Sequence, residues 1–342
     1  MRSKLNMREV AQKANVSLAT VSRAMHSPDK VSASTVERVR KATEELGYVY
    51  NATAGDILRG RSTVLGVLVP TASNALFGET LHGIQTMTVG GGYSVLQAAT
   101  HYDADGEEAL IESLLQRRVH ALILTGVTYG LEERVEQLAR EARVRIVVVW
   151  ELPKPDMTAS YVGFDNMEAA RRMTEYLIEL GHRRIGLIVG PFSKIARARH
   201  RLEGYRIALE RAGIPFDADI VKERSPGLLE GREAMDRLMR NEDRPTAVFA
   251  ASDLLAIGAL KAARSMGLSV PGDVSVAGFD DMEVASYQDP PLTTIRVDAY
   301  KIGQIAAQTA MEPLGSPTRN YCLDADLVIR GSTGPIKPGG GR

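Results

Sequence analysis

The sequence predicts an α/β protein with a small helical head. Through residues 62–333, short apolar runs alternate with amphipathic segments, which is typical of β-α units that build parallel sheets. The first fifty residues instead show three short segments with helical periodicity. Residues 1–61 contain 11 lysines and arginines against 6 acidic residues, although the whole chain is neutral. A head of net charge +5 therefore precedes a body of net charge −5, and such a head is attracted to nucleic-acid phosphates.

The head is predicted to be a helix-turn-helix. Its first helix would occupy about residues 7–14, where apolar side chains recur three and four positions apart. Ser17 is suited to cap the second helix. Ser32 or Ser34 would cap the third, which would end at Gly47 in the C′ position. Three such helices form one compact module.

The second predicted helix carries residue types that suit a DNA groove. A helix in the major groove must bring its backbone close to the bases, which favours small and short polar side chains in its first turn. Ser17, Thr20 and Ser22 suit contact with phosphates. Arg23 has the guanidinium fork that pairs with guanine O6 and N7, so we expect it to contact a base, with phosphate contact alone as the alternative.

The body is predicted from a regular succession of strands and helices. Short runs rich in β-branched residues predict buried strands at Val64–Val69, Ala121–Leu124, Ile146–Val149, Ile185–Val189, Ala247–Ala250 and Val274–Ala277. The segments between them predict helices at residues 78–89, 105–118, 131–142, 166–180, 197–212, 228–240 and 253–266. A body of this length favours two lobes, and ligands of parallel sheets bind where the strands end.

The motifs of the head carry a resemblance to a known family. They are Val16–Arg23, Val31–Ser32, Leu46–Tyr48 and Asn51, within the run Met7 to Arg61. This run resembles the head of the lactose-repressor/galactose-repressor (LacI/GalR) family of bacterial transcription regulators. Asp326–Thr333 is similar to the family's closing strand, so the resemblance covers nearly the whole chain. It implies a cytoplasmic homodimer that binds a two-fold operator in double-stranded DNA as a repressor of carbohydrate genes, under control of a small carbohydrate effector.

The resemblance also implies domain boundaries. The head and a hinge helix would occupy residues 1–61, the effector-binding and dimerisation body residues 62–333, and a disordered tail residues 334–342. The body would be a two-lobed, periplasmic-binding-protein-like domain with parallel sheets. Its N-lobe would comprise residues 62–161 and 292–324 and its C-lobe residues 162–291 and 325–333, with crossovers near residues 160–163, 290–293 and 324–327.

In the family, two residues at the start of the second helix set operator preference, and here these are Leu18 and Ala19. Both can contact a thymine methyl group but offer no side-chain hydrogen bond, so specificity should depend on Arg23 and on DNA shape. The family's hinge helix opens a base step in the minor groove with one leucine. That position holds Ile57, with Leu58 next to it, and either could be the wedge. The other hinge residues implied in DNA binding are Asn51 and Ala54.

The resemblance and the chemistry of the residues together place the effector-binding residues at strand ends and on one helix, where Arg197 is included because it lies one helical turn before Arg201. They are Phe77, Thr125, Trp150, Glu151, Arg197, Arg201, Ser252, Asp253 and Asp280. A carboxylate such as Asp280 can accept two sugar hydroxyls, although it could instead cap a turn. Trp150 and Phe77 could instead be core residues. Pro226 stands where the family commonly offers an aromatic platform, so stacking from that side is not expected.

Two arginines suggest a charged effector. Arg197 and Arg201 lie one helical turn apart, and guanidinium groups pair with carboxylate or phosphate. We therefore expect an anionic sugar derivative, a sugar acid before a sugar phosphate. Asp56–Leu58 and Val162–Asn166 also resemble regulators of gluconate use within the family. In the alternative, Arg197 pairs with an acid such as Glu203 and does not contact the ligand.

Other kinds of chemistry find little support in the sequence. The single cysteine, Cys322, excludes an internal disulfide and a thiolate metal cluster. No metalloprotease, nucleophile-elbow, P-loop or dinucleotide motif occurs, so no enzyme, cofactor or metal is expected. No apolar run is long enough for a membrane span. Two alternatives stay open: a periplasmic-type sugar-binding protein without DNA regulation, and a sugar-acting enzyme in which Asp280 works with Asp281 or Glu151.

Overall fold

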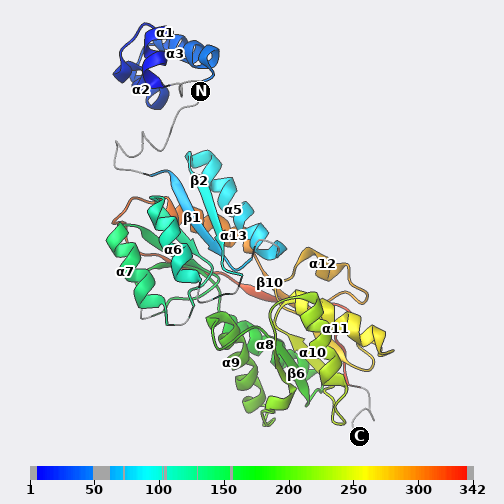
Figure 1. Ribbon diagram of the computed structural model, residues 1–342. Helices are drawn as coiled ribbons and strands as arrows, with labels where there is room; N and C mark the ends of the chain where they lie inside the picture. The colour runs from blue at the N-terminus through cyan, green and yellow to red at the C-terminus, as the bar shows by residue number, and fades with distance from the viewer. Residues whose placement is uncertain are drawn as a thin grey trace. The chain divides into compact units, whose positions relative to one another are not determined.

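The computed structural model describes residues 6–48, 62–71, 74–101, 103, 106–128, 130–154 and 157–336. The chain divides into a head, Met1–Ser62, and a body, Thr63–Arg342, and the body consists of two lobes (Figure 1). The predicted class, α/β with a three-helix head and parallel sheets, is confirmed. No helix in the described ranges is long and apolar enough to cross a membrane.

The head packs three helices around a small apolar core. Its elements are α1 (Met7–Lys13), α2 (Leu18–His26), the 3₁₀ turn η1 (Pro28–Lys30) and α3 (Ala33–Leu46). The Ser17 hydroxyl accepts the Thr20 amide as the cap of α2, and α3 follows Ser32 and ends at Gly47, which has a φ of 65°. The predicted helix ends are therefore confirmed. The core residues are Val10, Ala11, Ala14, Val21, Ala24, Val39 and Ala42.

The N-lobe is built on a parallel sheet whose described strands lie in the order β11-β5-β4-β3-β1-β2. They are β1 (Val64–Val69), β2 (Ser94–Ala99), β3 (Ala121–Leu124), β4 (Arg145–Val149), β5 (Ser160–Gly163) and β11 (Asn320–Cys322). Helices α5 (Ala75–Gly91) and α13 (Ala299–Ala310) cover one face, and α6 (Glu107–Gln116) and α7 (Glu132–Ala142) the other (Figure 1). Along β1, Leu65 and Val67 pack toward the first layer and Leu68 toward the second, as the two-residue period of a strand requires.

The C-lobe repeats this design on a smaller parallel sheet in the order β7-β6-β8-β9. Its strands are β6 (Ile185–Val189), β7 (Val221–Glu223), β8 (Ala247–Ala250) and β9 (Ser275–Ala277). Helices α8 (Asn166–Glu179) and α9 (Ala196–Arg211) cover one face, and α10 (Leu228–Met239) and α11 (Asp253–Ser265) the other. The 3₁₀ turn η2 (Ala218–Ile220) precedes β7, and the short helix α12 (Glu283–Ser286) follows β9.

Two antiparallel strands, β10 (Thr294–Val297) and β12 (Ala325–Val328), run together between the lobes, with Ile295 opposite Leu327. We call them the crossing strands. The crossover expected near residues 290–293 comes slightly later, because Thr293 is held in the C-lobe by hydrogen bonds to Gly278 and Ser332. The first crossing likewise follows β5, which stays in the N-lobe sheet through Gly163.

The tail expected to be disordered from residue 334 is ordered at its beginning. The Ile336 amide donates to the Leu180 carbonyl, and the Gly334 carbonyl lies 3.1 Å from Nε2 of the buried His182. Residues 337–342 lie outside the described part of the chain. The prediction of disorder is therefore wrong for residues 334–336, because the C-lobe supplies hydrogen-bond partners for their backbone.

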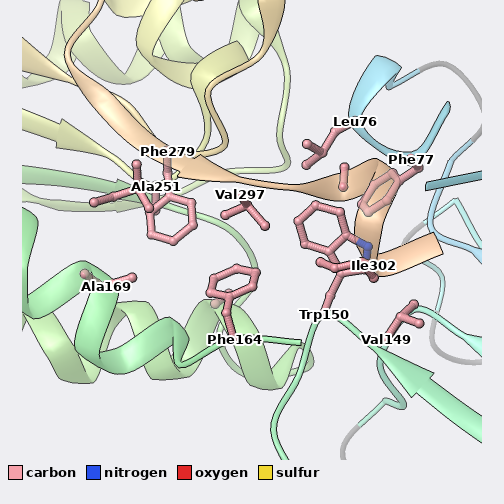
Figure 2. Close-up of a cluster of buried hydrophobic side chains, with 14 of the residues drawn as sticks. Leu76, Phe77, Val149, Trp150, Phe164, Ala169, Ala251, Phe279, Val297 and Ile302 are labelled. Atoms are coloured by element: carbon pink, nitrogen blue, oxygen red, sulfur yellow. The ribbon is translucent and has the colours of Figure 1, made fainter. Parts of the chain in front are cut away.

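One row of aromatic rings runs from lobe to lobe. Neighbouring ring centroids are 5.9 Å apart for Phe77 and Trp150, 6.0 Å for Trp150 and Phe164, and 6.0 Å for Phe164 and Phe279. Figure 2 shows these rings with Val297 of β10 packed among them. The two lobes therefore share a continuous apolar core where the chain crosses between them.

Helices α5 and α13 cross at glycines. A Cβ on Gly83 would lie 2.1 Å from the Tyr300 carbonyl oxygen, and a Cβ on Gly303 would lie 2.0 Å from that of Thr80. Such separations are impossible, so the pair of glycines allows the two backbones to touch. The same close approach occurs at Gly204 between α8 and α9 and at Gly231 and Gly258 between α10 and α11.

Gly303→Ala should lower the free energy of unfolding of the body by about 1–3 kcal/mol, because the new methyl group must push the helices apart. Gly78→Ala in α5 is the matched control, since a Cβ there meets nothing within 4 Å. It should stabilise the helix by about 0.5–1 kcal/mol. Urea unfolding followed by the fluorescence of the single tryptophan measures both, and equal stabilities of the two variants would contradict the expected steric clash.

Candidate functional site

The surface of α2 presents the side chains predicted to contact bases. Leu18, Ala19 and Arg23 are all exposed, and 44% of Leu18 is accessible although it is a large apolar residue. An exposed leucine at the start of a helix is available to a partner surface. The predicted hinge residues Asn51, Ala54, Ile57 and Leu58 lie outside the described residues.

Two of the hydroxyls predicted to contact phosphates already form hydrogen bonds at the start of α2. The hydroxyls of Ser17 and Thr20 lie 2.8 Å apart, and Ser17 also accepts the Thr20 amide. Each hydroxyl keeps a further hydrogen-bonding position, because an oxygen of this type can donate once and accept twice. Ser22 is half-buried on the same helix.

The predicted effector residues gather where strands of both lobes end. Thr125 follows β3, Trp150 and Glu151 follow β4, Ser252 follows β8 and Asp280 lies three residues beyond β9. They line two adjoining compartments, together with Phe77 from α5 and Arg197 and Arg201 from α9. Because carboxyl ends of parallel strands meet at one edge of a sheet, this convergence could be predicted from sequence.

The first hollow, which we call the Asp280 compartment, is lined by Phe77, Trp150, Arg201, Ser252 and Asp280 among others. The second, the Glu151 compartment, is lined by Glu107, Thr125 and Glu151 among others. Arg197 and Ile195 line both, so they stand between the two.

Arg201 is a buried guanidinium with protein partners on several sides. Its Nη1 donates to the Ala251 carbonyl at 2.7 Å and its Nε to Asn166 Oδ1 at 2.9 Å. Its Nη1 also lies 3.7 Å from Asp280 Oδ1, and its Cζ stacks 3.7 Å from the centre of the Phe279 ring. The side chain is thus fixed in one orientation at the wall of the Asp280 compartment.

Asn166 is a site residue that sequence reasoning missed. It begins α8, and its side chain accepts from Arg201 and donates to the Trp150 carbonyl at 2.9 Å. One buried amide therefore positions two of the predicted effector residues. The available signal was its place just after a buried strand, the same signal that pointed to Ser252 and Asp280.

Asp280 holds an unusual backbone and an unusual carboxyl group. Its φ is 117°, in a region that side chains rarely adopt, and its amide donates to the Ile295 carbonyl. Burial raises the pKa of Asp280 to about 6, although the positive charges of Arg201 and Arg197 oppose the rise. Burial likewise raises the pKa of Asp253, with the negative charge of Asp280 as the second cause.

Asp253 does not face the cleft as predicted. Its Oδ1 accepts from the Thr294 hydroxyl at 2.6 Å, and its Oδ2 accepts from the Met282 amide at 2.7 Å. The side chain is fully buried beneath the turn that carries Asp280. The correction has a simple cause: the residue begins α11, and its carboxylate turns toward β10 rather than toward the Asp280 compartment.

Three polar atoms at the Asp280 compartment are buried without a hydrogen-bond partner among the described residues. They are Trp150 Nε1, Ser252 Oγ and Asp280 Oδ1. Buried polar atoms in proteins are nearly always hydrogen-bonded, so unsatisfied donors and acceptors together at one hollow indicate a place for a polar ligand.

Arg197 reaches across the cleft. It belongs to α9 of the C-lobe, yet its Nη1 donates to the Thr125 carbonyl of the N-lobe at 3.2 Å. Its Cζ lies 5.9 Å from the centre of the Phe77 ring, at the outer range of a cation–π contact. The alternative pairing with Glu203 is not what the structure shows.

Glu151 and Asp281 are both ion-paired. Glu151 is buried with its Oε2 3.1 Å from Lys154 Nζ, which also contacts Glu132. Asp281 pairs with Arg296 and Arg330 instead of extending the cleft. Both acids named as possible catalytic partners of Asp280 therefore already have cationic partners. The described residues hold no cluster of side chains suited to a metal ion.

Asp280→Asn should change the stability of the protein in a pH-dependent way. Because the pKa of Asp280 is about 6 in the fold against 3.8 ordinarily, the folded state alone binds the proton between these values. Wild-type stability should therefore fall as pH rises through this window, and the uncharged asparagine should remove that loss. Urea unfolding at about pH 5 and about pH 7.5 should show a larger gain from the substitution at the higher pH. Asp243→Asn, on a side chain 82% exposed, is the control, and a gain from Asp280→Asn that does not vary with pH would contradict the shift.

Comparison with known proteins agrees with both parts of the chain. Residues 6–51 match the model of "Bacterial regulatory proteins, lacI family", and residues 174–333 match that of a periplasmic binding protein-like domain. The HTH-type transcriptional repressor CytR of Escherichia coli (strain K12) is 36% identical over 332 residues, covering 96% of each chain. The ribose operon repressor of the same strain is 32% identical, covering 95% of this chain and 99% of its own.

Solved structures show the same architecture. The Lac repressor dimer bound to operator and the anti-inducer ONPF has a TM-score of 0.84 at 28% identity, over 97% of this chain and 100% of that one. The complex of the transcriptional regulator CelR with cellobiose has a TM-score of 0.70 at 31% identity, over 96% and 99% of the two chains. The chain therefore belongs to the LacI family of bacterial transcriptional regulators, and it is a DNA-binding repressor of that type rather than a sugar-binding protein without a DNA-binding head.

Proposed function

We propose that a carbohydrate effector, bound in the Asp280 compartment, controls the affinity of this repressor for a two-fold DNA operator. The observation that carries the proposal is a set of buried atoms without a hydrogen-bond partner among the described residues. They are Trp150 Nε1, Ser252 Oγ and Asp280 Oδ1, the last of which lies near the Arg201 guanidinium. An indole N–H, a hydroxyl and a carboxylate oxygen together offer one donor, one donor-acceptor and one acceptor. Adjacent ring hydroxyls of a sugar can satisfy all three, since each hydroxyl both donates and accepts.

The walls of the compartment suit the rest of a sugar. Phe77 and Trp150 contribute apolar ring surface for its C–H groups, while the fixed guanidinium of Arg201 adds positive charge to the wall. Relatives support a carbohydrate as well, because the CelR structure contains cellobiose and a similar protein is named a ribose operon repressor.

We further propose that the effector carries an acidic group, and that Arg197 binds it. Two arginines led to this expectation, but Arg201 is engaged by Asn166, Ala251 and Asp280. Arg197 has a single described hydrogen bond, to Thr125, and its remaining donors lie at the boundary of the two compartments. A sugar acid is the first choice and a sugar phosphate the second, because Glu107 and Glu151 nearby disfavour a doubly charged group. The resemblance to regulators of gluconate use stays a prediction.

On the DNA side, we propose that Leu18, Ala19 and Arg23 contact bases and that a homodimer presents two copies of α2 to the two halves of an operator. Large exposed apolar side chains on the C-lobe, Leu228, Leu229 and Tyr287, support burial against a second copy. Opening or closing of the cleft would then alter the spacing of the two heads, with the effector acting through its different affinity for the two states.

Arg23→Met should weaken binding to the operator by ~1–3 kcal/mol and relax its sequence preference at one position per half-site. Arg40→Met is the matched control, because it removes the same charge from the head at a side chain already paired with Glu37 and Glu44. The operator is first selected from random duplex DNA, and affinities are measured by fluorescence anisotropy. Equal losses of operator affinity for the two variants would indicate that Arg23 contacts only phosphate.

Calorimetric titration should show tighter binding of D-gluconate than of D-glucose or D-ribose, because an acid can pair with Arg197. Arg197→Met should remove this preference while binding of neutral sugars changes little. Arg199→Met serves as the control, since Arg199 lies on the same helix but donates to the carbonyls of Phe192 and Ser193. If the wild type binds only neutral sugars, the proposal that the effector is acidic is wrong, but the proposal of a carbohydrate site is supported. If no sugar binds, the proposal of a carbohydrate site is wrong as well.

A further inference from the structure

Asp281 stands next to the proposed effector ligand but does not line either compartment. Both Asp280 and Asp281 have positive φ, 117° and 53°, so the turn after β9 directs their side chains apart. The Asp281 carboxylate is 9% exposed, and both of its oxygens are bound: Oδ2 lies 2.8 Å from Arg296 Nε and Oδ1 lies 2.7 Å from Arg330 Nη2.

One arginine belongs to a crossing strand and the other lies just beyond the second. Arg296 is part of β10, and Arg330 follows β12 by two residues. Arg330 also donates through Nη1 to the Leu292 carbonyl at 2.8 Å, and through its backbone to Thr293 Oγ1. One carboxylate therefore binds the turn at residues 280–282 both to β10 and to the segment that directly follows β12.

The same turn is bound to β10 at three consecutive residues. Asp253, which holds the Met282 amide, also accepts from the Thr294 hydroxyl. The Asp280 amide donates to the Ile295 carbonyl, and Asp281 pairs with Arg296. Because the turn is bound to three consecutive residues of β10, a displacement of Asp280 must also displace β10.

We propose that Asp281 is a positioning residue that transmits occupation of the effector site to the two crossing strands. This inference rests on the proposed function of Asp280. When effector binding displaces Asp280, the backbone at residues 280 and 281 moves with it, and the Asp281 carboxylate displaces Arg296 and Arg330. Asp281 does not touch the effector; it connects binding at one place to strand positions at another, which is what an allosteric coupling requires.

The geometry favours a connecting role over a merely stabilising one. Arg296 is 57% exposed, so its ion pair adds little to stability, and the less exposed Arg330 keeps its hydrogen bond to the Leu292 carbonyl when the carboxylate is lost. The Asp281 carboxylate nevertheless joins β10 to the segment that directly follows β12, a link that neither arginine could make without it. Loss of the carboxylate should therefore leave the fold intact and separate the turn from the strands.

The experiment is a double-mutant cycle in the full-length protein that needs no effector. Asp280→Asn removes the charge at the effector ligand, and hydrogen–deuterium exchange of residues 294–297 and 325–328 measures how the crossing strands respond. In the wild-type background we expect exchange in both strands to change by about 2- to 30-fold. In the Asp281→Asn background, Asp280→Asn should change the exchange rates of the two strands by less than about twofold.

Two further variants control the result. Arg296→Met removes one partner of Asp281 from an exposed position, so it folds readily and should reduce the response of β10. Asp243→Asn makes the same acid-to-amide change at an exposed pair with Arg184 and should leave the response to Asp280→Asn intact. A response that is equal with and without the Asp281 carboxylate, in proteins with unchanged near-ultraviolet circular dichroism, would overturn the proposal.

A second measurement separates this inference from the proposed function. With D-gluconate as the probe, Asp281→Asn should keep the calorimetric affinity of the wild type within about threefold. The effect of saturating D-gluconate on operator affinity should fall by about 2- to 30-fold. If D-gluconate does not bind the wild type, the proposed effector class fails while the exchange cycle still decides the role of Asp281. If D-gluconate binds and Asp281→Asn leaves its effect on the operator unchanged, the inference fails and the effector site stands.

Discussion

The arrangement of the two lobes of this repressor depends on one apolar core that both lobes share. The rings of Phe77, Trp150, Phe164 and Phe279 form a row from the N-lobe to the C-lobe, with centroids 5.9–6.0 Å apart. Because close-packed interiors resist separation, the lobes cannot part at this end without exposing the rings. Motion of one lobe relative to the other must therefore pivot at the crossing strands, which lie beside the row of rings. The width of the cleft can change mainly at the side away from the rings. Closure of this kind suits a regulator that converts a small ligand into a change of shape.

The cleft is built beside this core by strained turns. Trp150 and Asp280 have φ values of 72° and 117°, a conformation that costs of order 1–3 kcal/mol for a residue with a side chain. Trp150 comes directly after β4 and Asp280 three residues after β9, where the backbone must turn sharply to present a side chain to the opposite lobe. The strain keeps an indole N–H and a carboxylate aimed at a hollow before any ligand arrives, which reduces the ordering cost of binding.

Charge in the cleft is balanced by the protein before a ligand binds. Arg201 is neutralised by Asp280 and held by Asn166, Glu151 is paired with Lys154, and Asp281 joins Arg296 to Arg330. The partners of each group come from different elements, so each pair also fixes the position of one element against another. The side chains that line the cleft therefore also connect its helices and strands. A ligand that disturbs one ion pair affects the elements which that pair joins.

The sequence by itself determined the local structure and the general place of the site. Two-residue and helical periods placed strands such as Val64–Val69 and helices such as Asn166–Glu179 within a residue or two, because burial of apolar side chains dictates those periods. Trp150, Ser252 and Asp280 were expected at a cleft because parallel strands end together. Only the tertiary structure decided which polar side chains the protein satisfies itself. Asp253 turns toward Thr294, Asn166 holds Arg201, and Asp281 binds Arg330, each with a partner 35 or more residues away. The physical reason is that hydrogen bonds and ion pairs of this kind depend on where distant backbone segments meet, which no local period in the sequence records.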